Sequence, residues 1–168
     1  MANFAHRLKV ENDINTDYVI SGRYKFNIQD PQELAKHIFE DLEPDFAKKI
    51  KPGDFLVAGD NFGCGSSREQ APVALKASGL RAVLARSYAR IFYRNAFNVG
   101  FCLIECDTKF IDDMDELELD LSANMVRNVT KCVNINIKPL PYIMRRFLEA
   151  GGVIEYFKQK KGFEEFSA

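Results

Sequence analysis

The length, composition and charge of the chain limit the kinds of protein it can be. It has 168 residues, of which 46% are hydrophobic and 12% aromatic, so it can bury one sizeable core, and we expect one domain over residues 1–168. Its 23 lysines and arginines against 24 acidic residues exclude a general attraction to nucleic acid or to anionic membranes. The composition therefore favours a compact protein with another kind of partner.

The N-terminal sequence and the cysteines indicate where the protein works. No long apolar run follows residues 1–7, so we expect neither a secretory signal nor a membrane span, and a cytoplasmic location. The cysteines show no C-x-x-C spacing, and cytosolic thiols stay reduced. We therefore expect no disulfide framework and no zinc site, with Cys102 and Cys106 as small buried thiols.

Strands and helices alternate along the chain. In chain order we expect a strand ending over 8–10, a helix over 31–39 capped by Asp30, a short helix over 44–50, a strand over 55–59, a helix from Arg68 to Gly79, a strand over 82–85, a helix over 88–98, strands over 101–106, 117–121 and 133–137, and helices over 141–150 and 153–160. The central order β, α, β, α, β indicates the α/β class. The polar segment 11–17 favours turns and can present polar groups.

A glycine-containing loop between a strand and a helix carries the strongest chemical signal. It runs Gly59-Asp60-Asn61-Phe62-Gly63-Cys64-Gly65-Ser66-Ser67-Arg68-Glu69-Gln70. A helix N-terminus offers unpaired N–H groups and the positive end of the helix dipole, so we expect this loop to bind a carboxylate or a phosphate. Arg68 adds a planar cation that can bind such a group through two hydrogen bonds.

The same loop also fits a purely structural role. Ser66 and Glu69 match a capping box. Pro72 fits poorly into a helix that begins at Arg68, which favours a later start. A serine hydrolase is poorly supported, because the loop lacks Gly-x-Ser-x-Gly and the chain has only 2 histidines. A dinucleotide-binding loop is not supported either, because the third glycine of that motif is absent.

From Gly59 to Ala71 the sequence closely resembles the signature of the swivel domains of the aconitase superfamily, especially those of 3-isopropylmalate dehydratase small subunits. The likeness extends over nearly the whole chain and includes Asp13–Asp17, Asp30–Ala35, Ala85–Asn95 and Glu149–Gly152. It implies a single swivelling β/β/α domain over 1–168, as in the aconitase C-terminal domain. That domain closes over a large subunit that carries a 4Fe-4S cluster, so we expect this chain to bind no metal or cofactor itself.

The resemblance also implies roles for individual residues. Ser66 corresponds to the catalytic base, active as an alkoxide, and Arg68 to a catalytic group that also binds a substrate carboxylate. Ser67 corresponds to a further carboxylate ligand. Thr16 and Asp17 match a motif that reaches the active site, so they are candidate substrate-binding residues.

The bare residues are consistent with this chemistry. Dehydration removes a weakly acidic C–H next to a carboxylate, so the base must be strong and cations must meet the developing negative charge. N–H donors and a fixed guanidinium make an alkoxide conceivable at such a loop. Departure of hydroxide needs a Lewis acid, for which the chain has no convincing ligand cluster. A metal-bearing partner is therefore expected.

The segment after Ile20 bears on the choice of substrate. In the relatives it resembles, this segment usually reads Pro-x-Arg-Tyr-Leu; here Arg23 and Tyr24 are kept and Lys25 replaces the aliphatic residue. Lys25 can pair with an additional carboxylate, Phe26 can line a pocket for an alkyl-malate, or Lys25 can face solvent. Arg23, Tyr24 and Lys25 are therefore further candidate substrate-binding residues.

The function implied is that of the small subunit of a hydro-lyase, active only with its large subunit. It would isomerise a hydroxy-dicarboxylic acid by dehydration and rehydration, with 3-isopropylmalate and 2-isopropylmalate of leucine biosynthesis as the leading pair. The small subunit of homoaconitase or of 2,3-dimethylmalate dehydratase stays open within the same chemistry. An alternative of another class is a noncatalytic anion-binding or assembly module with the same fold.

Overall fold

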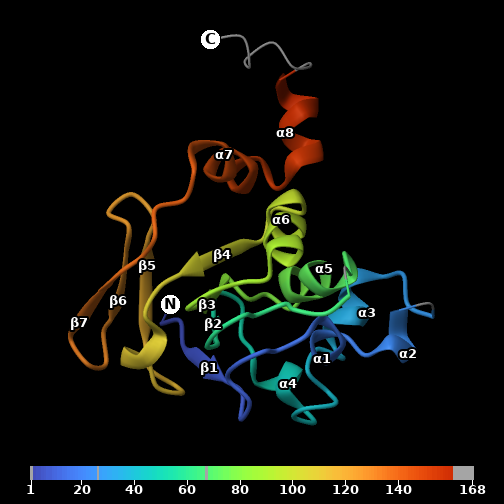
Figure 1. Ribbon diagram of the computed structural model, residues 1–168, viewed down its shortest axis with the longest axis horizontal. Coiled ribbons are helices and arrows are strands. Elements are labelled where there is room, and N and C mark those ends of the chain that lie inside the picture. Colours follow the sequence, from blue (N-terminus) through green and yellow to red (C-terminus); the bar gives the residue numbers. More distant parts are fainter. Residues whose placement is uncertain (1, 26, 67, 161–168) are drawn as a thin grey trace.

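A parallel sheet forms the centre of the chain. The computed structural model describes residues 2–25, 27–66 and 68–160. The strands of the sheet, β1 (Ala5–Arg7), β2 (Phe55–Val57), β3 (Ala82–Ala85) and β4 (Cys102–Glu105), lie side by side in the order of the sequence, as Figure 1 shows. Every residue of β2 and β3 is buried, which is why both strands are continuously apolar.

Helices connect and cover the strands of this sheet. The described helices are α1 (Thr16–Val19), α2 (Gly22–Lys25), α3 (Pro31–Ala35), α4 (Phe46–Lys49), α5 (Gln70–Ala77), α6 (Arg90–Asn98), α7 (Tyr142–Ala150) and α8 (Val153–Lys160), with a 3-10 turn, η1, at Thr108–Phe110. α5 joins β2 to β3 and α6 joins β3 to β4, so both are crossovers between parallel strands. α5 contacts α3 on one side and α6 on the other.

A second, antiparallel sheet stands at the end of the molecule opposite α2 and α3 (Figure 1). Its strands are β5 (Leu117–Asp120), β6 (Met125–Asn128) and β7 (Val133–Asn136), in that order. Buried and exposed residues alternate along β5, as expected for a sheet with one face in water. Single bridges, Phe4 to Glu116 and Cys106 to Ile137, link this sheet to segments next to β1 and β4.

A buried carboxylate holds together the starts of the first strands. Asp54 is 2% exposed, and its side chain accepts hydrogen bonds from the backbone N–H of Phe4 (2.8 Å) and of Lys51 (2.9 Å). Its Oδ2 lies 2.7 Å from Nε2 of His6, which is 4% exposed. Burial acts to raise the pKa of the Asp54 carboxyl, but these hydrogen bonds outweigh it and lower the pKa.

The α/β order expected from the sequence is confirmed, but several predicted boundaries are wrong. The first strand covers Ala5–Arg7 and not residues up to 10. The helix expected over 31–39 ends at Ala35, and turns follow it. Phe39 has a φ of 57°, which a right-handed helix cannot contain, and its N–H donates to the carbonyl of Val19.

The elements α1, α2, η1 and β6 were not predicted from the sequence, and for α1 and β6 the structure shows a physical reason. The polar segment 11–17 was expected to form turns only, yet it ends in α1, whose first turn is capped by the Asn15 side chain accepting from Tyr18 N–H at 2.9 Å. The strand β6 was not predicted because its inward position Asn128 is polar. Asn128 is fully buried and donates to Asp115 Oδ2 (2.7 Å), so the apolar alternation is broken.

We expect Asp54→Asn to lower the free energy of unfolding at pH 7 by about 2–4 kcal/mol, because charged hydrogen bonds at a buried site are lost. The pKa of Asp54 is lower in the folded chain than in the unfolded chain, where it is about 3.9. The stability that the Asp54 carboxylate contributes is therefore present above the unfolded pKa and is lost as the pH falls through the folded pKa. The wild type should therefore lose more stability than the variant on acidification below about pH 5.

Urea unfolding at a series of pH values measures this difference. Glu118→Gln is the control, because Glu118 is exposed and lies 3.7 Å from its partner Arg127. We expect it to change the stability by less than about 0.5 kcal/mol. Identical pH dependence in the wild type and in Asp54→Asn would contradict the role assigned to Asp54.

Candidate functional site

Three loops leave the same edge of the parallel sheet, after β1, β2 and β3. In parallel sheets this carboxyl edge is where ligands bind, because the loops there converge. The loops are joined by backbone hydrogen bonds from Gly63 N to Ile14 O (2.7 Å), Thr16 N to Cys64 O (2.9 Å) and Ala89 N to Phe62 O (2.9 Å). The polar segment 11–17 and the glycine-containing loop of the sequence therefore lie together.

A cluster of polar side chains, here called the loop clamp, adds side-chain bonds between these loops; it consists of Asn12, Asp13, Asp60, Asn61, Arg86 and Ser87. Asn12 Oδ1 accepts from Asp60 N (2.8 Å) and from Arg86 Nη2 (2.9 Å). Arg86 also donates to Asp60 Oδ2 through Nη2 (2.7 Å) and Nε (3.1 Å). This hydrogen-bonded guanidinium lowers the pKa of the Asp60 carboxyl.

The other half of the loop clamp centres on Asn61. Its side chain donates to Asp13 Oδ1 (2.7 Å), and its backbone N–H donates to Ser87 Oγ (2.8 Å). Asn61 and Asp13 both have positive φ values, 56° and 53°, which asparagine and aspartate tolerate better than most residues. A Cβ at Gly59 would lie 2.0 Å from Asn12 Oδ1, so only glycine fits beside the clamp.

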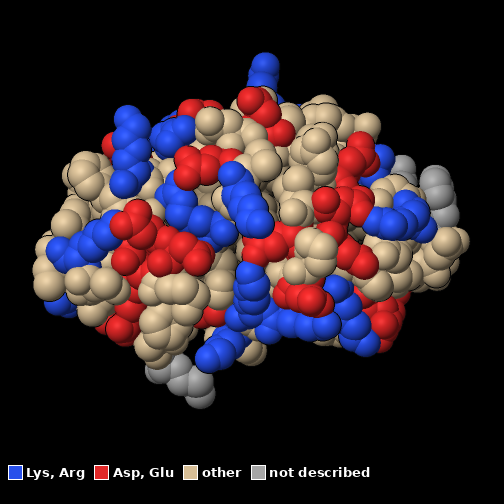
Figure 2. Space-filling model, turned by 90° about the horizontal axis from the view of Figure 1, so that it is seen from below, with Lys and Arg blue, Asp and Glu red and all other residues tan. Residues whose placement is uncertain are grey.

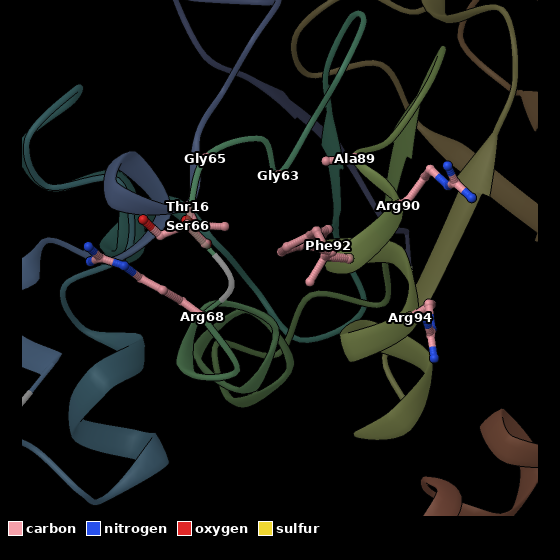
Figure 3. A pocket seen from close by; sticks show the side chains of 10 residues that line it. Thr16, Gly63, Gly65, Ser66, Arg68, Ala89, Arg90, Phe92 and Arg94 are labelled. Carbon is pink, nitrogen blue, oxygen red and sulfur yellow. The ribbon is translucent and has the colours of Figure 1, made fainter.

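A cavity of about 470 Å³ opens where the loops meet α6 (Figure 3). It is lined by Thr16, Gly63, Gly65, Ser66, Arg68, Ala89, Arg90, Ile91, Phe92 and Arg94. Hydroxyl groups and the Arg68 stem come from one side, and the beginning of α6 supplies the other side with apolar groups and two more arginines. The described lining contains no acidic residue.

Ser66 is exposed in this cavity and its backbone is held in place. Thr16, 1% exposed, donates through Oγ1 to the Ser66 carbonyl at 2.8 Å. The loop turns sharply ahead of it, with φ values of 80° at Gly63 and 88° at Gly65. A Cβ at Gly63 would lie 2.2 Å from Cγ of Phe92, so glycine is required there by close packing on α6.

Arg68 is the second predicted residue of the cavity lining, and Figure 3 shows its side chain extending from the lining in the direction away from Phe92. Its Nη2 forms an ion pair with Oδ1 of Asp17, although the contact lacks the geometry of a hydrogen bond. Its Nε and Nη1 are buried and have no hydrogen-bond partner among the described residues. A buried unsatisfied donor costs about 1–3 kcal/mol, so Arg68 is ready to bind an acceptor such as a carboxylate.

The structure corrects the predicted capping box. α5 begins at Gln70 and not at Arg68, and Glu69 occupies the N-cap position without a side-chain cap bond. Pro72 then lies in the first turn, where its missing N–H needs no partner. Ser66 therefore lies in the loop ahead of the helix, where its side chain is exposed and does not cap the helix.

Two of the predicted substrate-binding residues, Arg23 and Tyr24, are not part of the described cavity lining. Arg23 is ion-paired with Asp41. Tyr24 donates to Glu40 Oε2 at 2.7 Å and stacks on His37, with 4.0 Å between the ring centroids. The site brings together Ser66, Arg68, Thr16 and Asp17, and substrate binding by Arg23 and Tyr24 stays a prediction.

Some predicted positions cannot be placed, and others were missed. Ser67, Phe26 and the side chain of Lys25 lie outside the described residues. Arg90 and Arg94 line the cavity but were not singled out from the sequence. The sequence did contain a pattern that could have identified them: two arginines four residues apart at the start of a helix that follows a buried strand, which places both on one face of the helix.

No group of three or more His, Cys, Asp or Glu in the described part of the chain could hold a metal ion. All four cysteines, Cys64, Cys102, Cys106 and Cys132, are free. Burial raises the pKa of the Cys102 and Cys106 thiols to about 12, and a thiol must lose its proton to ligate a metal. The buried thiols of Cys102 and Cys106 are therefore poor candidates for metal ligands.

The described helices offer no candidate membrane span, and the face seen in Figure 2 carries charges of both signs. Among the described residues, no helix has the length and apolar character needed to cross a bilayer. Figure 2 shows one face of the molecule, on which lysines and arginines are interspersed with acidic residues. This mixture agrees with the net charge of -1.

The parallel sheet and its glycine-turned loop with Ser66 and Arg68 define an aconitase-type domain, and the family model of the aconitase C-terminal domain matches residues 10–109. The chain belongs to this family and, within it, to the 3-isopropylmalate dehydratase small subunits. It is 54% identical over 151 residues to "3-isopropylmalate dehydratase small subunit 1" of Archaeoglobus fulgidus, covering 89% of this chain and 93% of the relative.

Two further relatives extend this likeness. The 3-isopropylmalate dehydratase small subunit of Thermodesulfovibrio yellowstonii is 49% identical over 160 residues and covers 94% of each chain. The crystal structure of 3-isopropylmalate dehydratase from Methanocaldococcus jannaschii superimposes with a TM-score of 0.90 at 44% identity, covering 95% of this chain and 94% of that chain. The α/β fold of the aconitase C-terminal type, expected from the sequence, is confirmed.

We expect Arg86→Ala to loosen the loop clamp. Loss of its bonds to Asp60 and Asn12 makes local opening of the loop easier, so backbone amides of residues 60–64 should exchange with solvent about tenfold faster. Hydrogen exchange followed by mass spectrometry measures this change. Arg127→Ala, on β6, is the control and should leave these amides unaffected. Equal exchange in Arg86→Ala and the wild type would remove the clamp as a positioning device.

Proposed function

We propose that this chain is the small subunit of 3-isopropylmalate dehydratase, a hydro-lyase that interconverts 3-isopropylmalate and 2-isopropylmalate in leucine biosynthesis. It acts only when assembled with a large subunit. One observation carries the proposal: Ser66 and Arg68 line a single cavity in a chain 54% identical to a small subunit of that enzyme. The relatives' names supply the reaction and the partner, and the cavity supplies residues for it.

Ser66 is proposed as the base that removes the proton from the carbon next to a carboxylate. Its Oγ makes no hydrogen bond within the described part of the chain and lies in the cavity, so it is available to a substrate. Its backbone is fixed through the Thr16 hydroxyl. A fixed base in a positively lined cavity meets the two requirements of the step, position and stabilisation of its alkoxide form.

Arg68 is proposed as the ligand of a substrate carboxylate. Its Nε and Nη1 have no hydrogen-bond partner among the described residues and can donate to substrate oxygens, and Ser67 beside it in the sequence is expected to add a hydroxyl. The ion pair with Asp17 orients the guanidinium. We therefore assign Thr16 and Asp17 to positioning Ser66 and Arg68. The Thr16 hydroxyl is already bonded to the Ser66 carbonyl, and the Asp17 carboxylate is already paired with the Arg68 guanidinium.

The Lewis acid of the reaction is proposed to be a 4Fe-4S cluster on the large subunit. Departure of a hydroxide from the substrate needs such a group, and the described residues of this chain include no ligand set for one. The cluster would bind the departing hydroxyl, while this chain holds the carboxylate and moves the proton. A cytoplasmic location and a single domain over 1–168 remain predictions.

The roles of Ser66 and Arg68 are tested in the enzyme reconstituted anaerobically with its large subunit. We expect Ser66→Ala to lower kcat by about a hundredfold or more, because the proton acceptor is removed. Arg68→Lys should raise KM and lower kcat by about tenfold or more, because an ammonium cannot replace two guanidinium donors. Ser122→Ala, at an exposed turn, is the matched control and should be fully active. Full activity of Ser66→Ala would refute its assignment.

The physiological acid is tested by comparing substrates with the same complex. We expect kcat/KM for 3-isopropylmalate to exceed that for homoaconitate-type acids and for 2,3-dimethylmalate by at least about tenfold. The reason is that a pocket distinguishes these acids by how well it fits their different side groups. Steady-state absorbance of the unsaturated intermediate gives each value. A larger value for another acid would reassign the substrate. No turnover of any acid would favour a noncatalytic anion-binding or assembly module.

A further inference from the structure

Two arginines near the site have charges that nothing in the described chain neutralises. Arg90 and Arg94 are the first and fifth residues of α6, and both are exposed. Neither side chain has a hydrogen bond or an ion pair with a described residue. Other arginines at the same edge of the sheet are paired, Arg68 with Asp17 and Arg86 with Asp60. The excess positive charge of this edge therefore comes from α6.

These two arginines also belong to a second cavity. A hollow of about 420 Å³ lies along the other side of the first turns of α6 and is lined by Tyr88, Arg90, Tyr93, Arg94, Glu105, Lys138, Pro139, Leu140 and Pro141. The other two charges in this lining, Glu105 and Lys138, are paired with each other at 3.0 Å. Arg90 and Arg94 thus form the ridge between the two cavities and are the uncompensated charges of both described linings.

The direction of the side chains argues against direct contact with a substrate held at Ser66. Figure 3 shows the Arg90 and Arg94 side chains leaving α6 on the side away from Ser66 and Thr16. Their charges still act across the first cavity, because the Debye length is about 8 Å at physiological salt and low-dielectric walls focus the field. A doubly charged acid is attracted by both cations at once.

We propose that Arg90 and Arg94 form an outer capture site for dicarboxylate anions, which raises the local concentration of the substrate and steers it toward Ser66. The inference rests on the proposed function for the identity of the acid. The apolar floor of the second cavity, with Tyr93 and Leu140, suits an acid that carries an alkyl branch. Capture acts before the chemical step, so it affects kcat/KM and leaves kcat unchanged.

The test uses the complete two-subunit enzyme at low and high salt. In Arg90→Gln/Arg94→Gln, kcat/KM for 3-isopropylmalate should fall about tenfold at low ionic strength, with kcat within about twofold of the wild type. The difference should shrink toward zero in about 0.5 M salt, where screening is strong. Arg90→Lys/Arg94→Lys keeps both charges and should restore most of kcat/KM. Arg127→Gln removes an exposed arginine of β6 and should have no effect.

Three outcomes would overturn the capture site. The first is an unchanged kcat/KM at low salt in the double glutamine variant. The second is an equal fall in kcat, which would place the arginines in the chemical step. The third is a lower affinity for the large subunit together with a normal kcat/KM once the complex is saturated. That result would assign the arginines to docking of an acidic segment of the partner.

Failure of the proposed function gives a different result. If the wild-type complex shows no turnover, the capture site is tested by NMR titration of the full chain with 3-isopropylmalate. Shifts of the Arg90 and Arg94 side-chain signals in the wild type, with binding lost in the double glutamine variant, support the site. Absence of such shifts overturns it.

Discussion

The site depends on hydrogen bonds between loops that are distant in the sequence. Parallel strands bring the ends of β1, β2 and β3 to one edge, but strands of three or four residues alone leave the loops beyond them undetermined. The loop clamp and the Thr16 bond to Ser66 supply the missing constraint. Because each bond contributes only about 1 kcal/mol, the arrangement relies on several of them acting together.

Positive potential at the site arises although the chain as a whole is nearly neutral. With a net charge of -1, the protein can present a cationic cavity only by leaving particular arginines without full compensation. Arg68 is ion-paired with Asp17 through one nitrogen, and its other two nitrogens have no hydrogen-bond partner among the described residues. The side chains of Arg90 and Arg94 have no ion pair with any described residue. Binding of an acid and its approach would thus use different arginines.

The sequence predicted the fold class and located the loop of the candidate site, but it did not predict several details of the fold. Glycines next to serines and an arginine predict a loop that binds anions, because few other roles need those residue types together. Boundaries failed where tertiary contacts override local preference, as at Phe39 with its left-handed backbone and at buried Asn128 in β6. Arg90 and Arg94 were missed because an exposed arginine looks alike in sequence whether or not a carboxylate neutralises it.

All described residues of the cavity next to Ser66 fall between Thr16 and Arg94, inside the span 10–109 that the family model matches. The antiparallel sheet, α7 and α8 lie beyond that span and contribute nothing to this lining. One continuous segment of the chain therefore supplies every described residue of this lining. A substitution in the antiparallel sheet, α7 or α8 can alter this cavity only indirectly, by shifting the elements that pack against the segment.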